Sequence, residues 1–367
     1  MPNPAAASRI QTAKEISVTM IQTHGYAVQS ASDSPAPFDY QHRDPGPKDV
    51  HIQIDFCGIC HSDIHQARDE WGNAMYPMVP GHEIVGTVKA VGSDVKKFKV
   101  GDRAAIGCMV DSCGACPSCK EGDEQYCTGD HLVLTYNSRD KQGNLTFGGY
   151  ATDIVATEDF ILKVPESLDP AAAAPLLCAG ITTYSPLKHF GAGPGKKVGI
   201  VGLGGLGHMG LKFSHAFGAK TTQFTTSTKK IEDAKKLGAD EVILTTEPDW
   251  ASRHAGTFDI IIDCVSAEHD VTPYLSLIKR DGVYCTVGLP EKPFSVHAFS
   301  ILARKHMTGS MIGGIRETQE MLDFCAEKGI VSDIEMASYK DLDKAWERVI
   351  KGDVKYRFVL DCSELRK

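Results

Sequence analysis

Short apolar strands alternate with helical patterns between residues 198 and 287, and this alternation limits the possible fold more than any other feature of the chain. Runs typical of buried strands occur at residues 198–201, 221–224, 241–244, 258–265 and 283–287, and helical periodicity occurs at 206–217, 229–237 and 271–277. Strands that alternate with helices form right-handed βαβ units around a parallel sheet. The sequence therefore predicts a doubly wound α/β domain in this part of the chain.

The first 165 residues follow a different pattern. Residues 50–56 alternate polar and apolar side chains with period two, residues 83–92 resemble a second strand, and Gly and Pro punctuate the region. Two helical runs (318–328 and 342–352) and a closing strand at 356–360 follow the α/β part. We expect this last stretch to pack against the β-rich part. The predicted domains are therefore residues 1–178 with 315–367, and the α/β domain of residues 179–314.

Composition excludes several classes of protein. The 367 residues carry a formal net charge of -8, which disfavours nucleic-acid binding, and no run of about 18 apolar residues indicates a membrane span. Residues 1–14 lack the apolar core of a secretory signal. The 12 cysteines are partly clustered, which favours metal binding in a reducing compartment, so we expect a cytoplasmic protein. The extension before about residue 20 matches no recognised pattern.

A glycine-rich turn follows the strand at 198–201 and precedes the helix at 206–217. Gly202 permits a tight turn, Gly204 lets the backbone approach a pyrophosphate, and Gly207 allows the helix to pack closely on the strand. The phosphates are expected at the helix N-terminus, where free N–H groups favour anions. The residues predicted to bind the dinucleotide here are Gly202, Leu203, Gly204, Gly205, Leu206 and Gly207.

The end of the second strand of this domain predicts which dinucleotide binds. An NAD site usually offers Asp or Glu about 20 residues beyond the glycines. Here that place holds Thr225, Thr226, Ser227 and Lys230, and no carboxylate. Hydroxyl and ammonium groups can bind a 2′-phosphate that a carboxylate would repel, so we predict NADP(H). The same residues also suit a polar helix start, and the two interpretations are compatible.

Four cysteines form the densest motif in the chain: Cys113, Cys116, Cys119 and Cys127. This spacing lets a short loop close around one tetrahedral Zn²⁺ with no open ligand position, so the predicted metal is structural. Two alternatives are a nucleic-acid-binding zinc module, which the acidic loop disfavours, and an iron–sulfur protein. In bacterial ferredoxins the fourth cysteine comes after three residues and precedes Pro, whereas Cys127 comes after seven and precedes Thr128.

A second, open metal site is predicted from separate segments. Residues 60–65 and 80–83 are short, polar and rich in ligand-type side chains, and Cys178 follows an Ala/Leu-rich run. Two cysteines and a histidine with a vacant fourth position form a known type of catalytic zinc site. Spacing alone does not decide between Cys57 and Cys60, and the core is an alternative place for Cys178.

These motifs together resemble the zinc-dependent medium-chain dehydrogenase/reductase superfamily, and are most similar to its cinnamyl alcohol dehydrogenase branch with the microbial NADPH-dependent aldehyde reductases. The segments that carry the resemblance are residues 57–65, 77–83, 113–127, 174–187, 202–210 and 352–358. The resemblance implies a GroES-like β-barrel catalytic domain interrupted by a Rossmann domain, with the active site between them. It also implies two zinc ions per chain, NADP(H), and a homodimer joined through the Rossmann sheets.

The resemblance also implies a role for individual residues. Cys60 rather than Cys57 is the zinc ligand, together with His82 and Cys178. Glu83 approaches the zinc, and Asp63 orients a ligand. Ser62 and then His65 pass the alcohol proton outward. Thr225, Thr226 and Lys230 lie where relatives hold the 2′-phosphate.

The implied reaction is reversible, NADPH-linked reduction of aldehydes to primary alcohols over a broad range that includes aromatic substrates. Trp71, Met311 and Ile312 are expected in the substrate pocket, although a core position is an equal alternative for Trp71. Plant members often have Asp where this chain has Glu70, which weakens a plant-type substrate assignment. An NAD-linked alcohol or polyol dehydrogenase of the same superfamily is the alternative function.

Overall fold

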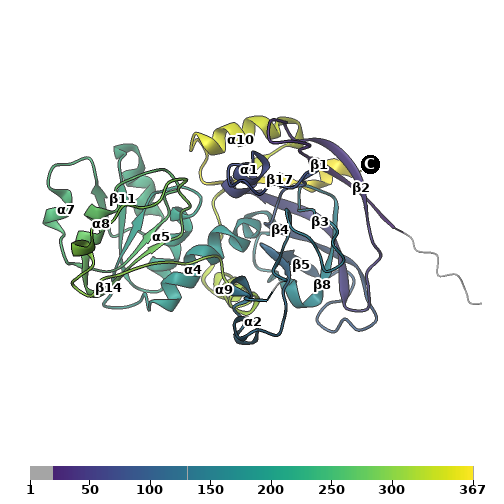
Figure 1. The fold of residues 1–367 in the computed structure, drawn as a ribbon, viewed down its shortest axis with the longest axis horizontal. Coiled ribbons are helices and arrows are strands. Elements are labelled where there is room, and N and C mark those ends of the chain that lie inside the picture. Colours follow the sequence, from purple (N-terminus) through teal and green to yellow (C-terminus); the bar gives the residue numbers. More distant parts are fainter. Residues whose placement is uncertain (1–19, 130, 367) are drawn as a thin grey trace, which may run out of the picture.

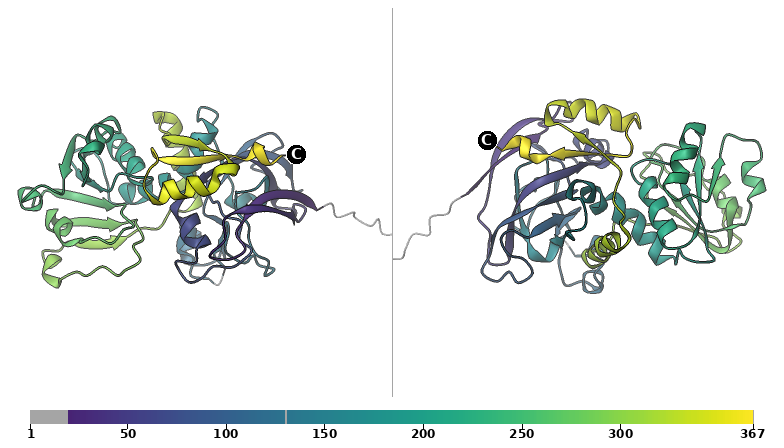
Figure 2. Two further views of the ribbon diagram at one scale, coloured as in Figure 1. Left: turned by 90° about the horizontal axis from the view of Figure 1, so that it is seen from above. Right: turned by 180° about the vertical axis from the view of Figure 1, so that it is seen from behind.

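The computed structural model describes residues 20–129 and 131–366, so the N-terminal extension discussed above lies outside the described residues. A β-rich body and an α/β body lie side by side, and the chain leaves the first body for the second and later returns to it (Figures 1 and 2). The predicted fold class, a GroES-like β domain with a Rossmann-type parallel sheet, is confirmed.

The β-rich body is built around β3 (Asp49–Ile59), which pairs antiparallel with β4 (Ile84–Val91), β8 (Asp153–Thr157) and β17 (Arg357–Asp361). Every second side chain at the start of β3 is fully buried (Val50, Ile52, Ile54), as its period-two pattern predicts. Because β17 belongs to this sheet, the end of the chain packs against its first half.

The sheet continues beyond these strands, and further strands and helices complete this body. The sheet order is β16-β17-β3-β4-β5-β9. The remaining strands are β1 (Ile21–Ala27), β2 (Ala36–His42), β5 (Arg103–Ile106), β6 (Met109–Asp111), β7 (Val133–Leu134), β9 (Leu162–Lys163) and β16 (Ile334–Ala337). The helices are α1 (His61–Ala67), α2 (Pro117–Glu121), α3 (Pro170–Ala173) and α10 (Leu342–Ile350).

The α/β body has a six-stranded parallel sheet in the order β12-β11-β10-β13-β14-β15. This is the strand order of a doubly wound dinucleotide-binding fold. The strands are β10 (Lys197–Val201), β11 (Lys220–Thr225), β12 (Glu241–Leu244), β13 (Phe258–Asp263), β14 (Ile278–Thr286) and β15 (His306–Gly309). The helices are α4 (Ala179–His189), α5 (Gly207–Ala216), α6 (Ile231–Lys236), α7 (Trp250–Arg253) and α8 (Thr272–Leu277). Helix α9 (Ile315–Lys328) belongs to the returning part of the chain and packs in the same core as α4 and α5.

Helices cover both faces of this sheet, which explains why its strands are apolar throughout. Ile260 and Ile262 of β13 pack in one core with α4, α5 and α9, whereas Ile261 packs in another core with Leu275 of α8. Buried on both faces, such strands form near-continuous apolar runs. The carboxyl ends of β10 and β13, at the point where the strand order reverses, are the usual ligand position in this architecture.

Two elements begin three or more residues earlier than the sequence predicts. Strand β14 begins at Ile278 rather than 283. Its pairing with β13 shifts register near the start, and Asp281 adopts φ +64°, so the first residues of the strand do not show a regular strand pattern in the sequence. Helix α9 begins at Ile315 rather than 318, and Glu124 Oε2 accepts the Ile315 N–H at 2.9 Å. Because Glu124 lies 191 positions before Ile315, the local sequence does not predict that the helix starts there.

Candidate active site

Cys60, His82 and Cys178 meet in the interior. Cys60 lies between β3 and α1, His82 precedes β4, and Cys178 begins α4. The sulfurs of Cys60 and Cys178 are 3.8 Å apart, and the ligand atoms of all three residues and Glu83 lie within 4.8 Å of one another. Two thiolates at about 2.3 Å from a tetrahedral zinc are themselves about 3.8 Å apart. This buried set, hereafter the open cluster, therefore fits Zn²⁺.

Cys57, the alternative ligand, points elsewhere. Its sulfur lies 3.6 Å from the Gly58 carbonyl and packs against Gly81 and Gly149. Burial raises the pKa of the Cys57 thiol, whereas the hydrogen bond from Cys178 holds the pKa of Cys60 well below its ordinary value. Geometry and charge both favour Cys60 as the ligand.

Asp63 holds two of these residues in place. It is fully buried, and its Oδ2 accepts the Cys60 N–H at 2.9 Å and the Tyr150 hydroxyl at 3.1 Å. Its Oδ1 accepts the Gly81 N–H at 3.1 Å and lies 3.1 Å from Nδ1 of His82. A carboxylate on one ring nitrogen orients the imidazole and leaves Nε2 for a metal.

Glu83 brings a buried negative charge to the open cluster. Its Oε1 accepts a hydrogen bond from Arg357, while Oε2 has no partner among the described residues. Burial raises the pKa of Glu83 to about 7, against the opposing charge of Arg357. A side chain at Gly58 would place Cβ only 1.9 Å from Oε2, so glycine is required there.

Arg357 also reaches the glycine-rich turn. A Cβ on Gly205 would lie 2.8 Å from Nη1 of this buried guanidinium. Arg357 therefore connects the open cluster with the predicted pyrophosphate site. The sequence did not single it out, although it lies in the motif at 352–358 that carries part of the resemblance.

Three aromatic rings stack along α1 and beyond it. His65 stacks on His61 at 4.4 Å between ring centroids and on Trp71 at 5.3 Å. Its Nδ1 contacts the Glu70 carboxylate, and its Nε2 is buried with no partner among the described residues. Ser62 is half-buried three residues before His65 on the same helix. The Ser62 hydroxyl, the His65 imidazole and the exposed Glu70 carboxylate are groups that can relay a proton between the interior and solvent.

The predicted pocket residues lie in different surroundings. Trp71 and Met311 are exposed, which excludes a core position for Trp71. Ile312 adopts φ +41°, a left-handed conformation that strains a β-branched residue. It lines a small cavity with Leu177 and Cys108, next to the open cluster.

The glycine-rich turn has the geometry that the sequence predicts. Gly202 has φ +84°, and a Cβ on Gly207 would lie 2.0 Å from the Gly202 carbonyl oxygen. A Cβ on Gly204 would meet nothing within 4 Å, which leaves its backbone open to a ligand. The turn can therefore accept a pyrophosphate at close range.

The predicted 2′-phosphate residues follow β11. Thr225 is buried and its hydroxyl accepts the Ser227 N–H, whereas Thr226 is exposed. Lys230 donates to the Leu203 carbonyl at 2.8 Å, and burial lowers the pKa of its ammonium group. This contact holds the lysine over the glycine-rich turn.

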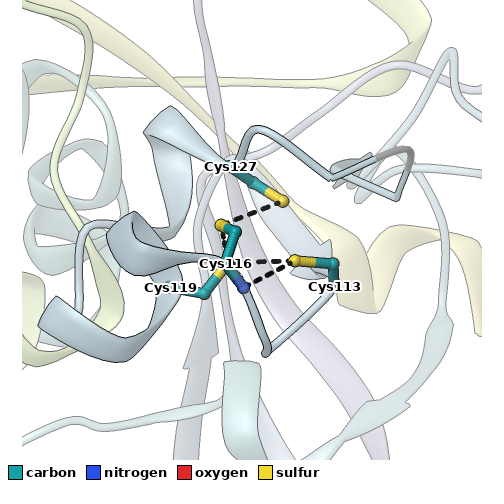
Figure 3. A group of neighbouring side chains, drawn as sticks. All are labelled: Cys113, Cys116, Cys119 and Cys127. Carbon is teal, nitrogen blue, oxygen red and sulfur yellow. Dashed lines mark hydrogen bonds between the residues drawn. The ribbon is translucent and has the colours of Figure 1, made fainter.

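The four cysteines of the 113–127 motif converge from one loop and α2, as Figure 3 shows. Sulfur–sulfur distances are 3.8 Å (113–119), 3.4 Å (116–119) and 4.0 Å (116–127). The N–H groups of Ala115 and Cys116 point at the Cys113 sulfur and hold the pKa of that thiol below its ordinary value. This cysteine lobe fits a second, closed tetrahedral zinc site.

Comparison with known proteins identifies the family. The family model for the alcohol dehydrogenase GroES-like domain matches residues 46–166, and that for zinc-binding dehydrogenases matches residues 205–327. The chain belongs to the zinc-binding alcohol dehydrogenases. The predicted branch, that of the cinnamyl alcohol dehydrogenases, is confirmed by its relatives.

Three relatives of this dehydrogenase illustrate the likeness. An NADP-dependent alcohol dehydrogenase of Mycolicibacterium smegmatis is 52% identical over 95% of this chain and 100% of its own. An aldehyde reductase of Escherichia coli is 53% identical over 90% of this chain and 96% of its own. The solved cinnamyl alcohol dehydrogenase of Sorghum bicolor has a TM-score of 0.91 at 44% identity, and covers 94% of this chain and 99% of its own.

Proposed function

We propose that this dehydrogenase catalyses the reversible, NADPH-linked reduction of aldehydes to primary alcohols at the open cluster, over a broad range that includes aromatic substrates. The observation that carries the proposal is the buried set of Cys60, His82 and Cys178 beside a dinucleotide turn. Relatives named as an NADP-dependent alcohol dehydrogenase and as an aldehyde reductase support the same reaction class.

When bound, Zn²⁺ would supply polarisation of the carbonyl group and NADPH would supply the hydride. Cys60, His82 and Cys178 hold the metal, and Asp63 keeps the imidazole of His82 oriented. Glu83 places beside these ligands an oxygen that has no hydrogen-bond partner among the described residues, and this oxygen could approach a bound metal and assist ligand exchange.

The proposed proton path runs through Ser62, His65 and Glu70. The Ser62 hydroxyl gives its proton to the nascent alkoxide and is reprotonated through His65. The Glu70 carboxylate holds the Nδ1–H of His65, so the doubly protonated ring can give its Nε2 proton to Ser62 and is left neutral until a proton from solvent recharges it. In this chain Glu70, at the position where plant members often have Asp, makes this contact with His65.

The cofactor site is proposed to select NADPH over NADH. Residues 202–207 receive the pyrophosphate, and Thr225, Thr226, Ser227 and Lys230 bind the 2′-phosphate. No carboxylate stands at the end of β11 to repel that phosphate. The alternative of an NAD-linked alcohol or polyol dehydrogenase predicts equal or faster turnover with NADH.

The cysteine lobe is proposed to hold a structural zinc ion, and the substrate pocket to include Trp71, Met311 and Ile312. We retain the division into residues 1–178 with 315–367 and residues 179–314. A homodimer through the α/β sheets is supported by the edge position of β15 and by the exposed apolar side chains of Phe299 and Leu302 shortly before it.

No helix in the described part of the chain combines the length and hydropathy that a bilayer span requires. The proposed location is the cytoplasm, which is supported by free cysteines at both metal-type clusters.

Metal analysis combined with steady-state kinetics tests the function. We expect about two zinc ions per chain, turnover of aromatic and aliphatic aldehydes, and a strong preference for NADPH over NADH. The Cys178→Ser variant is expected to lose turnover while its cysteine lobe keeps zinc. Full turnover without metal at the open cluster, or a preference for NADH, would refute the proposal.

A further inference from the structure

His208 lies directly after the glycine-rich turn, and its side chain is fully buried. Its Nδ1 is 2.8 Å from the Gly205 carbonyl oxygen and 3.3 Å from that of Gly204. Its Nε2 is 3.0 Å from Ser332 Oγ, and its ring lies nearly parallel to that of Tyr356 at 5.0 Å. The proposed mechanism uses none of these atoms.

These neighbours determine the protonation of the ring. Nδ1 faces only carbonyl oxygens within hydrogen-bonding distance, so it must carry the hydrogen. Burial lowers the pKa of His208 to about 3, so the imidazole is neutral near pH 7. Nε2 therefore keeps its lone pair and accepts the hydrogen of the Ser332 hydroxyl. Both ring nitrogens are satisfied by one tautomer.

The contact of Nδ1 with the Gly205 carbonyl fixes the direction of one peptide unit, whereas the Gly204 carbonyl also accepts the backbone N–H of His208 at 3.0 Å. The peptide unit is planar and trans, so its C=O and N–H point in opposite directions. Because the Gly205 carbonyl turns toward His208, the N–H group of Leu206 in the same peptide unit turns away from it. N–H groups of such a turn are the donors that a pyrophosphate meets.

The other side of the ring is attached to the returning chain. Ser332 is buried, follows α9 and precedes β16, and its N–H donates to the Ala172 carbonyl of α3 at 3.2 Å. His208 therefore stands between the turn of the α/β body and the segment that leads back to the β-rich body.

We propose that His208 is a positioning residue for the cofactor, whose Nδ1–H holds the Gly205 carbonyl so that the N–H group of Leu206 faces the pyrophosphate. The inference rests on the proposed NADPH-binding function and adds the residue that shapes its phosphate site. It predicts that NADPH affinity depends on a donor at the position of Nδ1, and not merely on a filled space.

Two substitutions distinguish the need for a donor at the position of Nδ1 from the need for a side chain that fills the space. His208→Asn places an amide nitrogen near the position of Nδ1, and His208→Gln places one near Nε2. Both remove the ring and its stacking on Tyr356, so both lose similar thermal stability. We expect the dissociation constant of NADPH to stay within about threefold of the wild type in His208→Asn and to rise about tenfold in His208→Gln, the effect of one lost buried hydrogen bond. The KM for NADPH is expected to change in parallel with the dissociation constant, whereas kcat at saturating NADPH changes less.

A ligand without a pyrophosphate is the matched control. Adenosine 2′-monophosphate is expected to bind the wild type and both variants equally, whereas Lys230→Ala weakens it. Equal loss of NADPH affinity in the Asn and Gln variants, or parallel loss of the monophosphate, would overturn the inference. A wild type that binds no NADPH would refute the proposed function instead.

A milder substitution keeps the inference testable if the histidine variants do not fold. Ser332→Ala removes the partner of Nε2 and leaves the contact of Nδ1 with the Gly205 carbonyl. NADPH affinity within about threefold of the wild type is expected. A tenfold loss would show that the donor at Nδ1 is not what sets the affinity.

Discussion

Replacing Asp63 by Asn tests how the open cluster is held, because it keeps the side-chain size and removes a buried charge. Oδ1 accepts from Gly81 and His82, and Oδ2 accepts from Cys60 and Tyr150. An amide NH₂ in place of Oδ1 would face two N–H donors. In place of Oδ2 it faces one N–H and a hydroxyl that can rotate to accept. The second orientation is favoured, and it deprives the Cys60 N–H of its acceptor.

The size of the effect follows from these contacts. A buried N–H without a partner costs about 1–3 kcal/mol. The hydrogen bond from His82 Nδ1 then reaches a neutral oxygen, and such bonds are roughly half as strong as those to a carboxylate. Both losses fall on proposed zinc ligands. We therefore expect zinc affinity at the open cluster to fall about ten- to a hundredfold, the range for partners of metal ligands.

Zinc release to a colorimetric chelator at increasing concentration measures this change. The cysteine lobe is an internal reference, because Asp63 contacts none of its residues and its zinc should be released as in the wild type. Tyr150→Phe is the matched control, since it removes one donor to Oδ2 and keeps the charge. The reasoning is refuted if Asp63→Asn retains both zinc ions like the wild type, or loses both together.

Four further predictions use other parts of the molecule. Lys230→Ala should raise the KM for NADPH about tenfold or more and leave that for NADH unchanged in steady-state assays. Glu70→Gln should lower kcat about tenfold, since a neutral amide orients His65 less strongly, and an unchanged kcat would remove Glu70 from the relay. Glu124→Ala removes the acceptor at the start of α9 and should lower the melting temperature by about 2 °C. The hydrogen bond to Asp263 raises the pKa of His269 above its ordinary value, so this stabilisation is complete below about pH 6.5 and is lost as pH rises through the raised pKa. The melting temperature of the wild type should therefore fall more between pH 6 and 9 than that of His269→Gln.

Features set by local spacing could be predicted from the sequence. The turn from Gly202 to Gly207 depends on conformations that neighbouring residues dictate, and its geometry is the predicted one. The cysteine lobe spans only 15 positions of the chain, so its spacing nearly dictates that the thiols converge. The parallel sheet is predicted because short apolar runs typical of strands alternate with segments of helical periodicity along the chain.

Features that join distant segments could not be predicted in the same way. Spacing left Cys57 and Cys60 equivalent, and only the position of the sulfurs in space favours Cys60. Arg357 contacts Glu83 across 274 positions, and Ser332 contacts His208 across 124. A lone arginine or serine in a loop or strand carries no local signal for such contacts, because the packing of the two bodies creates them.

The last part of the chain, residues 315–366, contacts each functional feature. Ile315 is capped by the cysteine lobe, Ser332 binds the histidine behind the glycine-rich turn, and Arg357 pairs with Glu83 in the open cluster. The last contact matters most for folding, because breaking a buried ion pair by removing one partner costs about 3–5 kcal/mol. A chain without β17 would bury the carboxylate of Glu83 without its cation. The open cluster can therefore form fully only after the end of the chain has joined the sheet of β3, although all of its proposed metal ligands precede residue 179.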